Sequence, residues 1–303
     1  MAKKAGERSL GRLEIEDLTE EKIEGFDFSE RIICAARWSD PVDNCVVFLA
    51  SERDKNITFA PFEKLKGCLA IVPAGLVVPE FLSVIRCERP RQVWSKIVRY
   101  LYDYENSFLK CPCNETDRIT LHQNVWIHPT AQIANGTEIG ANSIIQAGVV
   151  IGPKTKIGKN TLVMHGSIIG GQGFGADVTE NGVDVMPHIG GVLIGDNCSV
   201  GAGTIIDAGT ITETVISNHV ATGSLVHIAH NVEVGENCRL AARSGLSGSV
   251  KIGRNVFVGA GAMVRDGVTI GDHAFLGMMT AVIDNVPDNC TVVGVPGRIV
   301  KNN

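Results

Sequence analysis

Aliphatic residues recur at every sixth position through the second half of the chain. The register runs without a miss from Ile127 to Ile169, resumes over Ile194–Ile206, slips by four residues, and continues from Ile216 to Val282 with Thr222 as its one polar member. An α-helix requires an apolar residue every three to four positions, and a half-buried strand requires one at every second position. A period of six instead predicts a mainly β protein built on a left-handed parallel β-helix of the hexapeptide class.

Such a helix is a triangular prism in which three six-residue segments make one coil. Residues 18 apart in the sequence then stack at roughly the 4.8 Å spacing of neighbouring strands. The aliphatic ladder fills the axis of the prism, and each buried branched side chain contributes about 1.5–3 kcal/mol. We therefore interpret the ladder as scaffold and expect binding and catalytic groups at the corners and on loops.

The first part of the chain has a different composition. Of 34 glycines, 29 lie after residue 120, whereas 12 of 16 aromatic residues lie before it. We predict an N-terminal α/β domain over residues 1–115, with possible nucleotide binding, and the β-helix over residues 116–303. The α/β domain is expected to contain three strands and a helix, at Arg31–Arg37, Cys45–Ala50, Cys68–Val72 and Pro90 to about Tyr104.

An insertion at residues 170–193 interrupts the ladder. It opens with the glycine-rich run Gly170–Gly175 and continues with Thr179-Glu-Asn-Gly182, which is a hairpin signal. A β-helix accommodates such an excursion at a corner, where the added chain leaves the stack and returns. Because loops on a rigid scaffold commonly carry binding groups, we expect this insertion to contact substrate.

Charge and cysteine content exclude several classes of function. The net charge of −5 gives no basic surface for nucleic acid, and no run of like charge suggests membrane binding. The nine cysteines are scattered, and no apolar signal segment opens the chain, so we expect a cytoplasmic protein with mostly buried thiols. Cys111 and Cys113 lack further well-spaced ligands, so no metal is expected.

Two histidines flank the ladder residue Ile228 in the segment Val226–Val232. Counting one coil of 18 residues from the second of them, His230, leads to Gly248. A histidine and a glycine amide would then be adjacent on one edge of the prism. A proton acceptor beside an oxyanion donor is the pair that acyl transfer requires.

These residues carry a resemblance to a known family. The motifs Gly173-Phe-Gly175, Ile194-Gly-Asp196, Ile205-Ile-Asp207, Ile228-Ala-His-Asn231 and Gly248 resemble those of UDP-3-O-acylglucosamine N-acyltransferases of the lipid A pathway. In the N-terminal part, Val47–Ala50, Ala70–Pro73 and the helix opening at Arg89-Pro90 look like that family's uridine-binding domain.

The resemblance implies a homotrimer with active sites between prisms. It implies His230 as general base on the sugar amine and the Gly248 N–H as oxyanion donor. It further implies substrate contacts from Phe174, Gly175, His188, Asp207 and Asn231.

The sequence departs from that family at several positions. Ser51 replaces an asparagine, Gly267 stands where the family has a second histidine, and the chain stops at Asn303 without C-terminal helices suited to an acyl carrier protein. The ending Val292–Lys301 is instead similar to that of acetyl-CoA-dependent hexapeptide sugar acetyltransferases. That similarity implies acetyl-CoA as co-substrate, bound by Ser247, Ala260, Gly277, Pro296, Arg298 and Lys301.

We therefore expect an N-acetyltransferase that moves an acetyl group from acetyl-CoA to a nucleotide-linked amino sugar for cell-surface glycan synthesis. One alternative is UDP-3-O-(3-hydroxyacyl)glucosamine N-acyltransferase, which would use an acyl carrier protein as partner. A more distant alternative is a non-catalytic hexapeptide scaffold or a carbonic-anhydrase-like protein, whose zinc would require three converging histidines.

Overall fold

The computed structural model describes residues 8–25, 31–50, 57–109, 119–180 and 182–302. The chain divides into two compact units, one of residues 1–110 with 175–187 and the other of residues 111–174 with 188–303. Within the described ranges, no helix combines the length and the apolar character needed to span a membrane.

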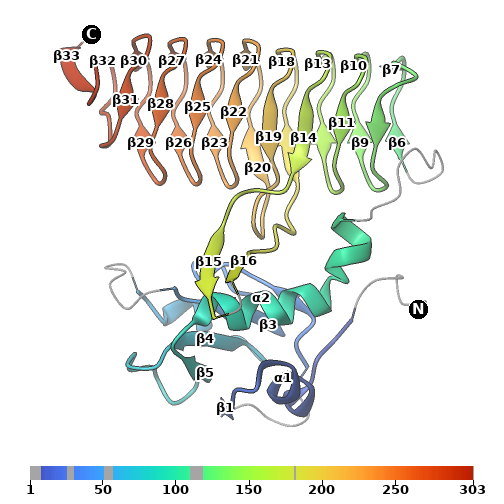
Figure 1. Ribbon diagram of the computed structural model, residues 1–303, viewed down its shortest axis with the longest axis vertical. Coiled ribbons are helices and arrows are strands. Elements are labelled where there is room, and N and C mark those ends of the chain that lie inside the picture. The colour runs from blue at the N-terminus through green and yellow to red at the C-terminus, as the bar shows by residue number, and fades with distance from the viewer. Residues whose placement is uncertain (1–7, 26–30, 51–56, 110–118, 181, 303) are drawn as a thin grey trace. The chain divides into compact units, whose positions relative to one another are not determined.

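The second unit is a prism with three parallel sheets as its faces (Figure 1). Sheet 1 contains β7 (Trp126–Ile127), β10 (Ile144–Ile145), β13 (Leu162–Val163), β18 (Ser199–Val200), β21 (Ala221–Thr222), β24 (Arg239–Leu240), β27 (Phe257–Val258), β30 (Phe275–Leu276), β32 (Cys290–Val293) and the antiparallel β33 (Arg298–Asn302). Sheet 2 contains β8 (Gln132–Ile133), β11 (Val150–Ile151), β14 (Ile168–Gly171), β19 (Ile205–Asp207), β22 (His227–Ile228), β25 (Gly245–Leu246), β28 (Met263–Val264) and β31 (Ala281–Val282). Sheet 3 contains β6 (Thr120–Leu121), β9 (Glu138–Ile139), β12 (Lys156–Ile157), β17 (Val192–Ile194), β20 (Thr214–Ile216), β23 (Glu233–Val234), β26 (Lys251–Ile252) and β29 (Thr269–Ile270).

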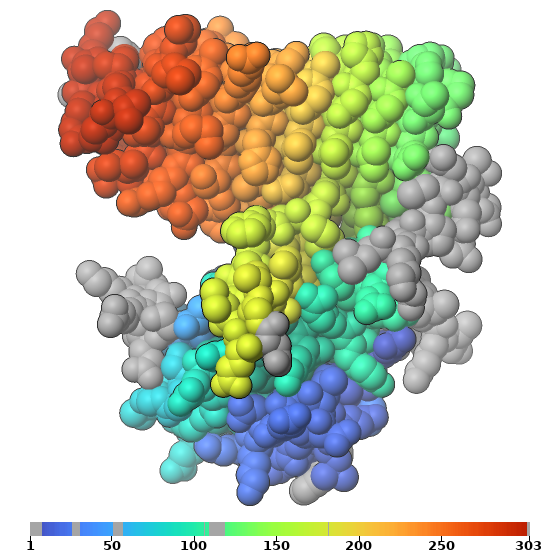
Figure 2. Space-filling model, viewed as in Figure 1, coloured from blue at the N-terminus to red at the C-terminus, as the bar shows by residue number. Residues whose placement is uncertain are grey.

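The aliphatic ladder forms the core of this prism. Residues 18 apart pair in register, as Ile145 does with Val163 and Ile151 with Ile169. The space-filling view shows the coils following one another as colour bands (Figure 2). Thr222, the polar member of the ladder, is buried, and its hydroxyl oxygen accepts a hydrogen bond from the Gly201 N–H (2.9 Å). This bond offsets the cost of burying a hydroxyl group.

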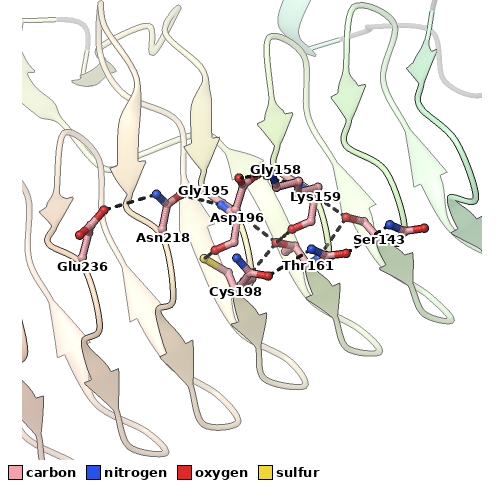
Figure 3. Close-up of polar contacts among 12 residues, drawn as sticks. Ser143, Gly158, Lys159, Thr161, Gly195, Asp196, Cys198, Asn218 and Glu236 are labelled. Atoms are coloured by element: carbon pink, nitrogen blue, oxygen red, sulfur yellow. Dashed lines mark hydrogen bonds and ion pairs between the residues drawn. The ribbon is translucent and has the colours of Figure 1, made fainter.

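Polar side chains connect successive coils at the corner between sheets 3 and 1. Asn142 accepts a hydrogen bond from Asn124 (3.2 Å) and donates one to Asn160 (3.3 Å), which donates to Asn197 (3.2 Å). All four have positive φ, a conformation that asparagine tolerates better than most residues. Figure 3 shows the neighbouring contacts that run from coil to coil among Ser143, Thr161, Cys198 and other residues of this region.

The N-terminal unit contains a five-stranded sheet in the order β1-β5-β4-β3-β2. Its elements are α1 (Arg12–Thr19), β1 (Ile23–Glu24), β2 (Cys34–Ala35), β3 (Cys45–Phe48), the 3-10 helix η1 (Ala60–Phe62), β4 (Leu69–Pro73), β5 (Ser83–Cys87), α2 (Pro90–Leu101) and the π-helix η2 (Glu105–Leu109). Trp94 of α2 is fully buried against Phe48 of β3, with ring centroids 5.0 Å apart. The sequence patterns predicted β3, β4 and α2 closely. The strand predicted over Arg31–Arg37 is limited to β2, and α1, β1 and β5 were missed.

The insertion contributes a hairpin to this N-terminal unit. Strands β15 (Ala176–Thr179) and β16 (Gly182–Val185) pair antiparallel, as the Asn-Gly signal predicts. Asp177 accepts a hydrogen bond from Arg91 of α2 (3.0 Å), and Asp184 lies 3.7 Å from Arg99. These ion pairs join the hairpin to α2, a partner that local sequence patterns do not indicate.

Candidate functional site

His230 lies in a turn that joins sheet 2 to sheet 3. It follows β22 and precedes β23, and Ile228 points into the core with no exposed surface. We call the turns that follow β19, β22 and β25, at residues 208–213, 229–232 and 247–250, the His230 corner. Ser249 in the next coil donates its N–H to the carbonyl oxygen of His230 (2.9 Å), which holds these two turns together.

Gly248 lies directly against the imidazole ring of His230. A Cβ atom at this position would be 2.6 Å from Cε1 and 2.8 Å from Nε2 of His230. Any residue with a side chain would therefore displace the ring. The structure thus brings together the histidine and the glycine that the 18-residue count placed on one edge.

Asn231 clamps the His230 turn to the coil below. Its Oδ1 accepts the Thr210 N–H (2.8 Å), its Nδ2 donates to the Thr210 hydroxyl (3.0 Å), and its own N–H donates to the Thr214 hydroxyl (3.0 Å). The same Nδ2 lies 3.1 Å from Nδ1 of His230. Asn231 has φ 59°, so its backbone conformation also favours asparagine here.

The returning segment of the insertion, between β16 and β17, places His188 beside His230. The His188 side chain is fully buried, and the two ring centroids are 4.8 Å apart. Gly173, in the segment that leaves β14, makes this approach possible, because a Cβ atom there would be 2.7 Å from His188 Nε2 and 2.9 Å from His230 Cβ. His188 therefore packs behind the candidate base and is not exposed to solvent.

Two further side chains hold the insertion at this corner. The Gln172 amide accepts the His188 N–H (3.2 Å) and donates to the His188 carbonyl oxygen (3.3 Å). Lys154 donates its Nζ to the Ile189 carbonyl oxygen (2.9 Å). Burial lowers the pKa of Lys154, and the nearby Glu213 opposes that shift.

Asp207 and His227 form an ion pair on the outer face of sheet 2. His227 Nε2 lies 3.1 Å from Asp207 Oδ2, and the carboxylate is largely buried while the imidazole is half exposed. The hydrogen bond that the His227 ring donates to the Asp207 carboxylate raises the pKa of His227 above its usual value of 6.5. The substrate contact expected of Asp207 would therefore compete with an internal partner.

The structure separates several residues that the sequence grouped as donor contacts. Ser247 is in the His230 corner, whereas Ala260 and Gly277 follow β27 and β30, in turns that join sheet 1 to sheet 2. Arg298 and Lys301 are exposed on β33, which pairs antiparallel with β32, and Pro296 lies in the turn between these two strands. Among the expected substrate contacts, Phe174 is 83% exposed and Gly175 begins the excursion into the N-terminal unit.

Sequence patterns missed the second layer of this site. Thr210 and Thr214 lie in or beside the four-residue slip of the ladder, and that slip was the one signal that the corner below His230 differs from its neighbours. Gly173 stands in the glycine-rich run, but its partners are distant in sequence. Within the ranges that the structure describes, no group of three or more His, Cys, Asp and Glu side chains is arranged to hold a metal ion.

Comparisons with known proteins agree with this architecture. The family model for "Bacterial transferase hexapeptide (six repeats)" matches residues 118–153, 213–248 and 249–283. The family model for "Hexapeptide repeat of succinyl-transferase" matches residues 174–208. This chain carries bacterial transferase hexapeptide repeats. The predicted resemblance and the predicted left-handed parallel β-helix are both confirmed.

Several relatives have names that describe an acyltransferase. UDP-3-O-acylglucosamine N-acyltransferase from Caulobacter vibrioides is 47% identical over 163 residues, which are 54% of this chain and 43% of the relative. The enzyme of the same name from Ectopseudomonas mendocina is 38% identical over 125 residues, 41% of this chain and 30% of the relative. The chain thus spans less than half the length of these curated relatives.

Among solved structures, UDP-N-acetylglucosamine acyltransferase from Campylobacter jejuni is similar to this chain. The TM-score is 0.56 with 25% sequence identity, and the match covers 62% of this chain and 71% of the other. The Arabidopsis enzyme of the same name has a TM-score of 0.55 at 22% identity, covering 61% of this chain and 65% of that one, which supports the fold alone.

Proposed function

We propose that this protein transfers an acyl group from a thioester to the amine of a nucleotide-linked amino sugar. The observation that carries the proposal is the contact of the His230 imidazole with Gly248. A side chain at position 248 would displace the ring. The names of the relatives support the same chemistry, since they describe N-acylation of a UDP-linked acylglucosamine.

In the proposed reaction the amine nitrogen attacks the thioester carbonyl carbon directly. A carbon–nitrogen bond forms, and the carbonyl electron pair moves to oxygen, where the Gly248 N–H donates a hydrogen bond to the oxyanion. His230 takes the proton that the amine loses and returns it to the thiolate that leaves when the intermediate collapses. The products are an amide and a free thiol, and no covalent enzyme intermediate is required.

The identity of the acyl donor is a separate part of this proposal. The sequence led us to expect acetyl-CoA, but the relatives' name fits the alternative, transfer of a hydroxyacyl chain to UDP-3-O-acylglucosamine, better. We therefore propose UDP-3-O-acylglucosamine as acceptor and a hydroxyacyl carrier protein as donor. The acetyl-CoA reaction remains the competing proposal.

A cavity in the N-terminal unit supports nucleotide binding there. It has a volume of about 300 Å³ and lies at the start of α2, lined by Ala50, Glu88, Arg89, Pro90, Arg91 and Asp177, among others. Two arginines line it, Arg89 and Arg91, and Arg91 also pairs with Asp177 (3.0 Å). Guanidinium groups bind phosphate, so we propose that this cavity holds the nucleotide.

We further propose a homotrimer, as the family resemblance implies. Within one chain, the apolar side chains Val150, Ile168 and Ile205 form a row of partly exposed rungs on the outer face of sheet 2. Packing against copies of this chain would remove that apolar surface from water. Light scattering tests the proposal, and an active monomer would contradict it.

A matched set of donors and acceptors tests the reaction. The purified protein is incubated with UDP-3-O-acylglucosamine or other nucleotide amino sugars, and with 3-hydroxyacyl carrier protein or acetyl-CoA, and amide formation is followed by mass spectrometry. We expect product from the carrier protein and UDP-3-O-acylglucosamine. If amide forms with acetyl-CoA and not with the carrier protein, acetyl-CoA is the donor. The absence of amide in every combination would contradict the proposed reaction.

A further inference from the structure

The side-chain amide of Asn231 has only one possible orientation. The backbone N–H of Thr210 can donate a hydrogen bond but cannot accept one, so the atom 2.8 Å from it must be the amide oxygen of Asn231. The amide nitrogen is then the atom that faces Nδ1 of His230, at 3.1 Å. The Thr210 hydroxyl, 3.0 Å from the same nitrogen, accepts its other hydrogen.

This orientation determines which nitrogen of His230 carries the proton. An amide nitrogen donates hydrogen bonds and does not accept them, so Nδ1 must be the acceptor and must be unprotonated. We infer that Asn231, held by Thr210, fixes neutral His230 in the tautomer that has its proton on Nε2. An imidazolium, with protons on both nitrogens, would place two N–H groups against each other, so the same contact disfavours the charged ring.

The tautomer determines whether His230 can accept a proton at Nε2 during the reaction. This step of the inference rests on the proposed function. Nε2 and Cε1 form the edge of the ring nearest Gly248, where the reaction is proposed to occur. A nitrogen that already carries a proton cannot accept another, so the resting tautomer is not competent as a base at Nε2. For catalysis one proton must leave Nε2 and one must bind Nδ1, with water as carrier, after the Asn231 amide has moved from Nδ1.

Asn231 is therefore a positioning residue that holds the base inactive until substrate binds. The Asn231 amide is bonded to two groups of Thr210 and to His230, so a sugar hydroxyl that accepts the hydrogen now donated to His230 would release Nδ1. Asp at position 231 would behave differently. A carboxylate still accepts the Thr210 N–H, but it accepts from Nδ1 instead of donating to it, and it favours the tautomer with a free Nε2.

The test is a nitrogen NMR spectrum of the substrate-free protein labelled with ¹⁵N-histidine, recorded at about pH 8.5, where a free imidazole is neutral. The His230 signals are identified by their loss in His230→Gln. We expect protonated Nε2 in the wild type and protonated Nδ1 in Asn231→Asp. Asn231→Gly, which retains the positive φ but removes the amide, should show a mixture of both forms. Protonated Nδ1 in the wild type, or an unchanged tautomer in Asn231→Asp, would overturn the inference.

Steady-state kinetics test the consequence for the base. We expect Asn231→Asp to raise kcat relative to wild type, because its resting tautomer already has a free Nε2. A kcat for Asn231→Asp no higher than that of wild type, despite a switched tautomer, would overturn the inference that Asn231 holds the base inactive. The spectrum does not depend on turnover, so inactivity of the wild type with every donor would contradict the proposed function and leave the tautomer assignment standing.

Discussion

Gly248 lies one coil beyond His230, and a Cβ atom on it would be 2.6 Å from Cε1 of the imidazole. Glycine is thus required at this position because its lack of a side chain leaves room for the ring. Its backbone N–H is the group that we propose as oxyanion donor.

Gly248→Ala should therefore lower kcat/KM by about 100-fold or more, because the added methyl group displaces His230 from the reacting atoms. The thermal unfolding midpoint should change little, since the ring is only half buried. Lys251→Ala, an exposed change on β26, is the control and should retain wild-type kinetics. Wild-type activity in Gly248→Ala would remove this contact from the mechanism.

His230→Ala should lower kcat by at least about 100-fold and leave the affinity for the sugar nucleotide nearly unchanged. The reason is that a general base acts in the transition state and not in substrate binding. Initial rates measure the first quantity, and calorimetric titration with the sugar nucleotide measures the second. An unchanged kcat would show that His230 is not the base.

Gly173→Ala should reduce activity through His188. The new Cβ would meet His188 Nε2 at 2.7 Å and His230 Cβ at 2.9 Å, so both rings must shift. Gly171→Ala is the matched control, because its Cβ would meet nothing nearer than Ile168 Cγ2 at 3.5 Å. We expect a loss of kcat of about tenfold or more in Gly173→Ala alone. Equal losses in both variants would instead indicate a general effect on the loop.

The pairing of His227 with Asp207 should make stability depend on pH. The pKa of His227 is raised in the folded protein, so the pair stabilises the fold fully below the unfolded pKa of about 6.5, and this contribution is lost as pH rises through the folded pKa. The difference in unfolding free energy between wild type and Asp207→Asn should therefore be larger at about pH 6 than at about pH 8.5. Denaturant titrations measure it, and equal differences would contradict the assignment.

Substitution of Arg298 and Lys301, the exposed cations of β33, tests for acetyl-CoA as acyl donor more sharply than truncation of the chain does. Removing the last ten residues would also delete the strand that pairs with β32, and so would disturb the end of sheet 1. The double variant Arg298→Ala/Lys301→Ala keeps that backbone. With a carrier-protein donor these cations do not bind CoA, so the KM for the donor should remain unchanged. A large rise in the KM for acetyl-CoA alone would favour the acetyltransferase alternative.

The sequence predicted those features that repeat. A period of six residues determines which side chains point inward, and the 18-residue coil then determines which residues stack, so His230 and Gly248 could be paired by counting. The clamp of Asn231 on Thr210 could not be found in this way, because the ladder slips by four residues between them. His188 was also out of reach of counting, since it approaches His230 through an insertion that has no period.

The hairpin of β15 and β16 shows that the two units are interleaved along the chain. Residues 175–187 belong with the N-terminal unit, although they leave and rejoin the prism within the coil that precedes β17. A chimera that exchanged only residues 1–110 for those of a relative would leave Asp177 and Asp184 facing a foreign helix in place of Arg91 and Arg99. Exchange of the proposed nucleotide site therefore requires two segments to be transplanted together.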